Sequence, residues 1–197
     1  MSRERARACR EGLAISHALG DRRGEALALG NLGEVLCRLG RYQQAEDHLG
    51  RALTIFRAAG FRHGEADALQ NLGRLFQRQA RFQDAAGFHR RALVIFGELG
   101  DRSAEAESIS SLGEALLGVG LPEQARAQYQ DALTLARRIG DQYEQARAHD
   151  GLARAYHATS DPGQARHHWQ QALTLYTEVG APEADQVRAQ LGAAEER

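Results

Sequence analysis

Apolar residues recur every three or four positions along this chain, which is the spacing of one face of an α-helix. In the first clear segment the apolar face consists of Ala28, Leu32, Val35, Leu36 and Leu39. After a break at Gly40-Arg41-Tyr42, a second apolar face consists of Ala45, Leu49, Ala52, Leu53 and Phe56. The pattern predicts two helices joined by a tight turn.

The two-helix pattern repeats with a period of forty residues. Its glycine column consists of Gly20, Gly60, Gly100, Gly140 and Gly180. Its leucine column consists of Leu32, Leu72, Leu112 and Leu152. Its alanine columns consist of Ala26, Ala66, Ala106 and Ala146; Ala45, Ala85, Ala125 and Ala165; and Ala52, Ala92, Ala132 and Ala172. Columns in one register predict helix pairs at 22–59, 62–99, 102–139 and 142–179, each covering the apolar stripe of the next.

Small residues in the alanine columns have a packing reason, because two helices in a tight hairpin need them where the backbones approach. The column that contains Ala52, Ala92 and Ala132 is therefore expected to contact a neighbouring backbone. Glycine is expected to cap the helix ends in the left-handed conformation. Asp21, Asp101 and Asp141 follow glycine and are expected to be N-caps of the next helices.

The ends of the chain depart from the pairwise pattern. Residues 4–19 match a second helix that lacks its first helix, and its face with Leu13, Ile15 and Leu19 is expected to be partly uncovered. Residues 182–195 match a first helix without its second and are expected to cap the array. An uncovered apolar face favours association with other repeats or with another copy.

Charge and cysteine content narrow the class of protein. The net charge is −1, from 25 basic and 26 acidic residues, and a nucleic-acid binder usually has a basic excess. Cys9 and Cys37 are too few for a disulfide framework. No run of about 18 apolar residues predicts a membrane span, and the first residues lack the apolar core of a signal peptide. These features predict a cytoplasmic location, with no membrane and no nucleic-acid partner.

Several motifs resemble the tetratricopeptide repeat (TPR). They are Ala28-x-x-Asn31-Leu32-Gly33, Gly40-x-Tyr42-x-x-Ala45 and Ala52-Leu53-x-Ile55, and the second repeat has Asn71-Leu72-Gly73, Phe82, Ala85 and Ala92-Leu93-x-Ile95. Later repeats differ, since Ser111 and Gly151 replace the asparagine, and Pro122 and Pro162 replace the aromatic residue. The period of forty exceeds the basic repeat of about 34 residues. It is similar to the long-helix type found in sensor arrays of bacterial transcriptional activators and signalling ATPases, and in polarity adaptors.

The resemblance implies an all-α fold, a right-handed superhelical solenoid of antiparallel helix pairs that forms a single array over residues 1–197. It implies that the first helices line a concave groove, and that the groove holds a peptide or a partner segment. The groove residues that it implies are Asn31, Glu34, Arg38, Gln70, Asn71, Arg74, Arg78, Ser110, Ser111, Glu114, Asp150 and Arg154.

The chemistry of these side chains fits recognition. An asparagine can donate to and accept from a peptide backbone at once. Arg74 and Arg154 are able to take carboxylates bidentately. Glu34 and Glu114 alternate in sign with these two arginines at one position, which suits a ligand of mixed charge. The same alternation equally suits ion pairs between neighbouring repeats, on a solvent-exposed helix face that binds no ligand.

No motif predicts catalysis, a metal site or a cofactor. His149 and His157 lie eight residues apart, and the adjacent His167 and His168 diverge around the helix axis, so they do not form a zinc pattern. His149 stands in a column of otherwise aliphatic residues, where it is expected to loosen the fourth repeat or to make it sensitive to pH. Trp169 is expected to be a packing residue.

These features together predict a non-catalytic scaffold that binds a protein or peptide, as the sensor or regulatory part of a larger bacterial regulator. Two alternatives stay open. One is a small-molecule sensor with a pocket between repeats. The other is a structural module that forms a homo-oligomer through its open N-terminal end.

Overall fold

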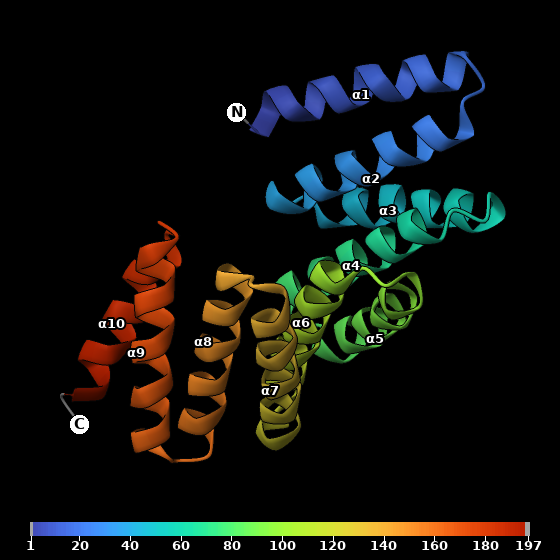
Figure 1. The fold of residues 1–197 in the computed structure, drawn as a ribbon. Coiled ribbons are helices and arrows are strands. Elements are labelled where there is room, and N and C mark those ends of the chain that lie inside the picture. The colour runs from blue at the N-terminus through green and yellow to red at the C-terminus, as the bar shows by residue number, and fades with distance from the viewer. Residues whose placement is uncertain (1, 196–197) are drawn as a thin grey trace. The chain divides into compact units, whose positions relative to one another are not determined.

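The computed structural model describes residues 2–195, and in this part the chain is built from ten α-helices without a β-strand (Figure 1). The helices are α1 (Ser2–Ala18), α2 (Arg22–Arg38), α3 (Tyr42–Ala58), α4 (Arg62–Arg78), α5 (Phe82–Leu99), α6 (Arg102–Val119), α7 (Pro122–Ile139), α8 (Gln142–Ala158), α9 (Pro162–Glu178) and α10 (Glu183–Glu195). The all-α fold class is thus confirmed. Met1 and residues 196–197, which the predicted array includes, lie outside the described residues.

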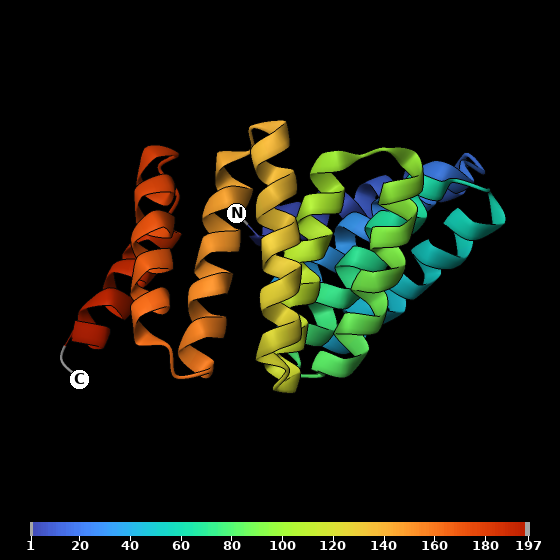
Figure 2. The ribbon, with the colours of Figure 1, turned by 60° about the horizontal axis from the view of Figure 1, so that its bottom comes forward.

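The chain divides into two compact units, residues 1–99 (unit 1) and residues 100–197 (unit 2). In unit 1, α2 packs on α3 and α4 packs on α5, while α1 covers α2 and α3 contacts α4. In unit 2, α6 packs on α7 and α8 packs on α9, with α7 against α8 and α10 against α9 (Figure 2). Each unit also brings its first helices together, α2 with α4 and α6 with α8.

Alanine occupies buried positions in every helix pair. All members of the three alanine columns are buried, and eleven of these twelve residues have no exposed surface; Ala165 is 1% exposed. Larger apolar side chains, among them Leu32, Leu72, Leu112 and Leu152, fill the space beside them. The prediction that Ala52, Ala92 and Ala132 are packing residues is therefore confirmed.

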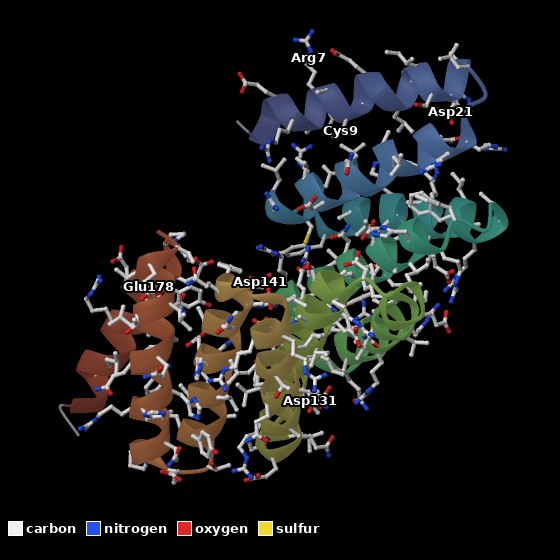
Figure 3. All side chains as sticks on the ribbon, viewed as in Figure 1. Arg7, Cys9, Asp21, Asp131, Asp141 and Glu178 are labelled. Atoms are coloured by element: carbon white, nitrogen blue, oxygen red, sulfur yellow. The ribbon has the colours of Figure 1, made fainter. Side chains whose placement is uncertain are left out.

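Short carboxylates begin several helices. Asp21, Asp101 and Asp141 each accept a hydrogen bond from the backbone N–H three residues ahead, at 2.9, 3.1 and 2.9 Å, as expected of N-caps. Figure 3 labels Asp21 at the start of α2 and Asp141 at the start of α8. Asp161 caps α9 in the same way, next to Pro162. Two residues that are not glycine, Ala80 and Ser160, take the left-handed conformation in turns where other repeats have glycine.

The outer face of α1 is uncovered in unit 1, as predicted. Ile15 is 60% exposed and Leu19 is 77% exposed, although α1 packs on α2 through its other face. Leu13 is half-buried. Within residues 2–195 no helix has the length and apolar character needed to span a bilayer.

A tyrosine in unit 2 occupies space that two glycines leave open. Tyr129 on α7 is 1% exposed, and its ring lies against Gly113 on α6 and Gly151 on α8. A Cβ added at Gly113 would lie 3.0 Å from the ring, and one added at Gly151 would overlap it. Gly151 stands where the first two repeats have asparagine, so the tyrosine ring accounts for that departure from the TPR pattern.

We expect Gly151→Ala to lower the free energy of unfolding by about 1–3 kcal/mol, because the new methyl group overpacks the core against Tyr129. Urea denaturation measures the change. Gly87→Ala in α5 is the matched control: nothing lies within 4 Å of its added Cβ, so it gains about 1 kcal/mol of helix propensity.

Adding Tyr129→Leu, the residue of the first repeat at that position, is expected to recover much of the loss from Gly151→Ala. A Gly151→Ala protein that unfolds at the wild-type midpoint would show that the Tyr129 ring has room to move.

Candidate functional site

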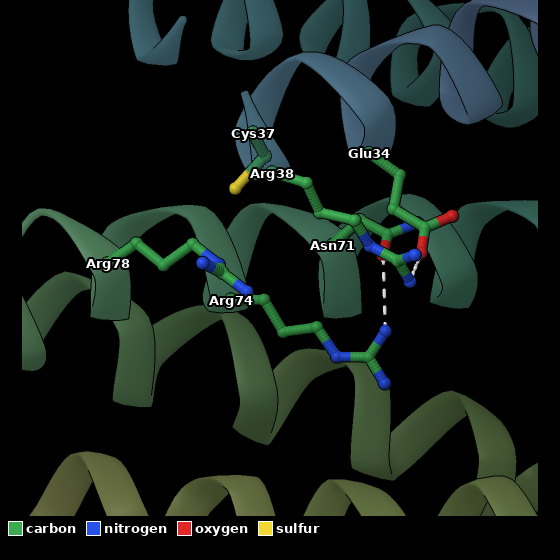
Figure 4. A pocket seen from close by; sticks show the side chains of 6 residues that line it. All are labelled: Glu34, Cys37, Arg38, Asn71, Arg74 and Arg78. Atoms are coloured by element: carbon green, nitrogen blue, oxygen red, sulfur yellow. Dashed lines mark hydrogen bonds and ion pairs between the residues drawn. The ribbon is translucent and has the colours of Figure 1, made fainter. Parts of the chain in front are cut away.

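A pocket of about 260 Å³ lies between the first helices of unit 1 (Figure 4). Its lining residues come from α2 and α4, and they comprise five of the predicted groove residues together with Cys37. They are Glu34, Cys37, Arg38, Asn71, Arg74 and Arg78. Successive turns of a helix present one face, and the forty-residue register aligns that face on α2 with the matching face on α4.

The pocket is rich in positive charge. Arg38 donates to Glu34 at 2.6 Å along α2, and Arg74 donates to the side-chain oxygen of Asn71 at 3.4 Å along α4 (Figure 4). The exposed Arg78 has no hydrogen bond or ion pair to another described residue of unit 1. The lining of the pocket thus contains three guanidinium groups and one carboxylate.

Cys37 forms the buried end of the pocket. Burial raises the pKa of its thiol, an effect that the charge of Arg78 opposes. The cysteine is therefore a neutral thiol that packs beneath the arginines. Cys37 is a free cysteine, and its burial suits a packing residue.

Two of the predicted groove residues in unit 1 lie outside this pocket. Asn31 is exposed on α2 and is not a lining residue. Gln70 is 5% exposed, and its Oε1 lies 2.8 Å from Nδ1 of His89, a fully buried histidine whose Nε2 lies 3.1 Å from Gln77. Gln70 therefore belongs to a buried polar layer between α4 and α5 rather than to an open surface.

The corresponding face of unit 2 is occupied by its own polar network. Ser110 and Ser111 on α6 are fully buried. Ser110 donates to Glu144 on α8 at 3.0 Å, and Arg147 donates to Ser111 at 2.9 Å. Arg147 also pairs with Glu144 at 3.3 Å and with Glu114 at 3.7 Å, so it bridges α6 and α8.

The remaining predicted residues of unit 2 join a second set of internal contacts. Asp150 pairs with Arg154 at 3.3 Å along α8 and accepts a hydrogen bond from the indole N–H of Trp169 on α9 at 3.2 Å. Burial raises the pKa of the Asp150 carboxyl, and the neighbouring Arg154 partly offsets this. Trp169 is buried, as predicted, and it also positions Asp150.

Sequence reasoning missed Glu144, the centre of the network in unit 2. Its column holds Gly24, Gly64 and Ala104 in the earlier repeats, so a glutamate there is an exception to a column of small residues. That exception was a usable signal, because a charged residue at a small, buried position needs partners. Ser110 and Arg147 supply them.

The fold and the site together define this chain as a helix-pair repeat protein. The first helix of each pair carries polar side chains on one face. The sequence profile of the tetratricopeptide repeat matches residues 24–97 and 103–178. The chain therefore belongs to the tetratricopeptide repeat family. No curated protein matches it in sequence.

Solved structures share the fold at low identity. BtubC (BKLC) from P. vanneervenii is 19% identical with a TM-score of 0.81, and the match covers 100% of this chain and 84% of that one. A signal transduction ATPase with numerous domains (STAND) from Pyrococcus horikoshii, which has a TPR sensor, is 17% identical with a TM-score of 0.79, and the match covers 88% and 27%. A Rap protein complexed with competence and sporulation factor is 16% identical with a TM-score of 0.75, and the match covers 86% and 49%.

Nothing in the family match points to catalysis. Among residues 2–195 no group of three or more His, Cys, Asp or Glu side chains is arranged to hold a metal ion.

Arginines with different surroundings are expected to respond differently to truncation. Arg147→Ala should lower the free energy of unfolding by about 2–3 kcal/mol, because Arg147 is 21% exposed and its loss strands the buried Glu144. Arg78→Ala should change stability by less than about 0.5 kcal/mol, since it is an exposed residue without a partner in unit 1. Urea denaturation of both variants at neutral pH tests the pair of expectations. Equal losses of stability in the two variants would contradict the distinction between Arg147, which belongs to an internal network, and Arg78, which is exposed.

Proposed function

We propose that this chain is a non-catalytic binding scaffold, and that the α2–α4 face of unit 1 binds an acidic peptide or an acidic segment of a partner protein. The observation that supports the proposal is the composition of the pocket lining, which holds the guanidinium groups of Arg38, Arg74 and Arg78 and the carboxylate of Glu34. An arginine is well suited to carboxylates because its planar donors bind both oxygens. Asn71, which also lines the pocket, can donate to and accept from the backbone of the same segment.

Arg78 supports placing the site in unit 1, because it is exposed and has no hydrogen bond or ion pair to another described residue of that unit. In unit 2, Arg147 is tied to Glu144, Glu114 and Ser111, and Arg154 is tied to Asp150. A ligand there would have to break contacts that the protein already makes. Glu114, Asp150 and Arg154 therefore act within unit 2 in this proposal, and Asn31, next to the pocket on α2, extends the binding face of unit 1.

A regulatory or sensor role within a larger protein is the finer part of the proposal. It is supported by the fold that this chain shares with the TPR sensor of the STAND protein and with the Rap protein complexed with a peptide factor. The chain spans about a quarter of the first and about half of the second. Both likenesses concern the fold, and the ligand class is argued from the arginines alone.

The test begins with a displayed library of random peptides panned against the intact chain. We expect the selected peptides to be enriched in Asp and Glu, and their affinity to fall as salt is raised, because the contacts are between exposed charges. Calorimetry with one selected peptide then compares variants. The Asn71→Ala, Arg74→Ala double variant should lose about 2–5 kcal/mol of binding free energy if the charge pair is desolvated on binding.

Arg154→Ala in unit 2 is the matched control and should leave the affinity unchanged. Full affinity in the double variant would show that the α2–α4 face is not the binding site. Selected peptides without acidic residues would contradict the proposed ligand class.

A further inference from the structure

Two histidines that are nineteen residues apart meet between α8 and α9. Nδ1 of His149 lies 2.9 Å from Nδ1 of His168, and His149 is 5% exposed. The ring centroids are 5.1 Å apart, and this distance exceeds the separation of the two nitrogens by about two ring radii. The two nitrogens therefore point at each other and not at a shared third atom. Such a contact needs one proton: one nitrogen donates and the other accepts.

The surroundings of the pair offer no counter-charge for a second proton. His168 stacks on Tyr156 at 5.4 Å and 9°, and it also contacts His167. The charged groups that face the pair are Arg137 and, across the Tyr156 ring, Arg126, both on α7. Among the described residues no carboxylate from α6, α7, α8, α9 or α10 acts on either imidazole.

The pair stands beside the other polar contact between these helices. His149 and Asp150 are consecutive on α8, and they contact His168 and Trp169, which are consecutive on α9. α10 packs on α9, so whatever holds α9 also holds α10. Both views of the ribbon show α8 and α9 side by side (Figures 1 and 2).

We propose that the His149–His168 pair is a proton-sensitive latch, which stabilises α9 against α8 while the pair holds one shared proton and favours opening of α9 together with α10 when both rings become protonated. The latch is independent of the binding face proposed in unit 1. Release would also free Asp150 from Trp169 and so alter the polar face of unit 2.

The direction of the pH effect follows from burial. Burial lowers the pKa of His149 from its ordinary 6.5 to about 4, and burial also lowers the pKa of His168. Below pH 6.5 the released state therefore takes up protons that the latched state resists. The contribution to stability is complete above that pH and is lost as the pH falls toward 4. From His149 alone, the opening equilibrium should rise roughly twenty-fold between pH 7 and pH 5.

The second repeat contains a matched arrangement without titratable rings. Phe88 on α5 stacks on Phe76 at 5.2 Å and 10°, as His168 stacks on Tyr156, and Leu69 stands where the fourth repeat has His149. The double variant His149→Leu, His168→Phe thus reproduces a packing that this chain already uses. It is expected to fold and to keep α9 in place.

Hydrogen exchange of the intact chain, corrected for intrinsic rates, measures opening of α9 at pH 7, 6 and 5. Protection of α9 and α10 amides should fall roughly twenty-fold in the wild type and less than two-fold in the double variant. Amides of α6 and α7, which carry no histidine, are the internal control. Trp169, the only tryptophan, gives a second readout: its emission should shift to longer wavelength on acidification in the wild type alone.

Two results would overturn the latch. One is a loss of protection in the double variant as large as in the wild type, which would assign the acid response to other groups. The other is unchanged protection of α9 in the wild type down to pH 5.

Discussion

The close approach of helix backbones at the alanine columns is the constraint on which the rest of this structure depends. Alanine adds a methyl group and no more, so two helices can meet at a distance that leucine or valine would prevent. Because the columns recur every forty residues and are buried in every repeat, each pair meets its partner in the same way. That shared geometry puts side chains of successive first helices side by side. The polar faces of α2 with α4 and of α6 with α8 are consequences of it.

The same geometry leads to different chemistry in the two units. In unit 1 the aligned positions hold three arginines and one glutamate, which line a pocket between α2 and α4. In unit 2 a glutamate at a small-residue position draws Arg147 and Ser110 into a closed network. Buried polar groups are costly unless they are fully partnered, so the closed network of unit 2 favours rigidity. A repeat scaffold thus keeps one backbone while its faces diverge.

The sequence period predicted the helices and their caps because both depend on residues that are near each other in the chain. Asp21, Asp101 and Asp141 needed only the glycine before them and the helix after them to be recognised. The contacts of Gln70, Glu144 and His149 were not predicted, since each depends on a side chain from another helix and on its rotamer. His149 was recognised as an exception to an aliphatic column, but its partner His168 was dismissed because it diverges from His167. Two adjacent histidines that point to different sides of one helix can still each meet a side chain from a neighbouring helix.

The three-way fit of Tyr129 with Gly113 and Gly151 has a consequence for how such arrays change over evolutionary time. Repeat proteins are often treated as strings of interchangeable modules, to be duplicated, deleted or shuffled. Here the ring of Tyr129 on α7 contacts both α6 and α8. The third repeat therefore needs a glycine at position 151, in the repeat that follows it. A copy of the second repeat placed after it would bring an asparagine into the ring and fail to stack. The packing therefore constrains which repeat can follow the third one, and substitutions at these three positions depend on one another.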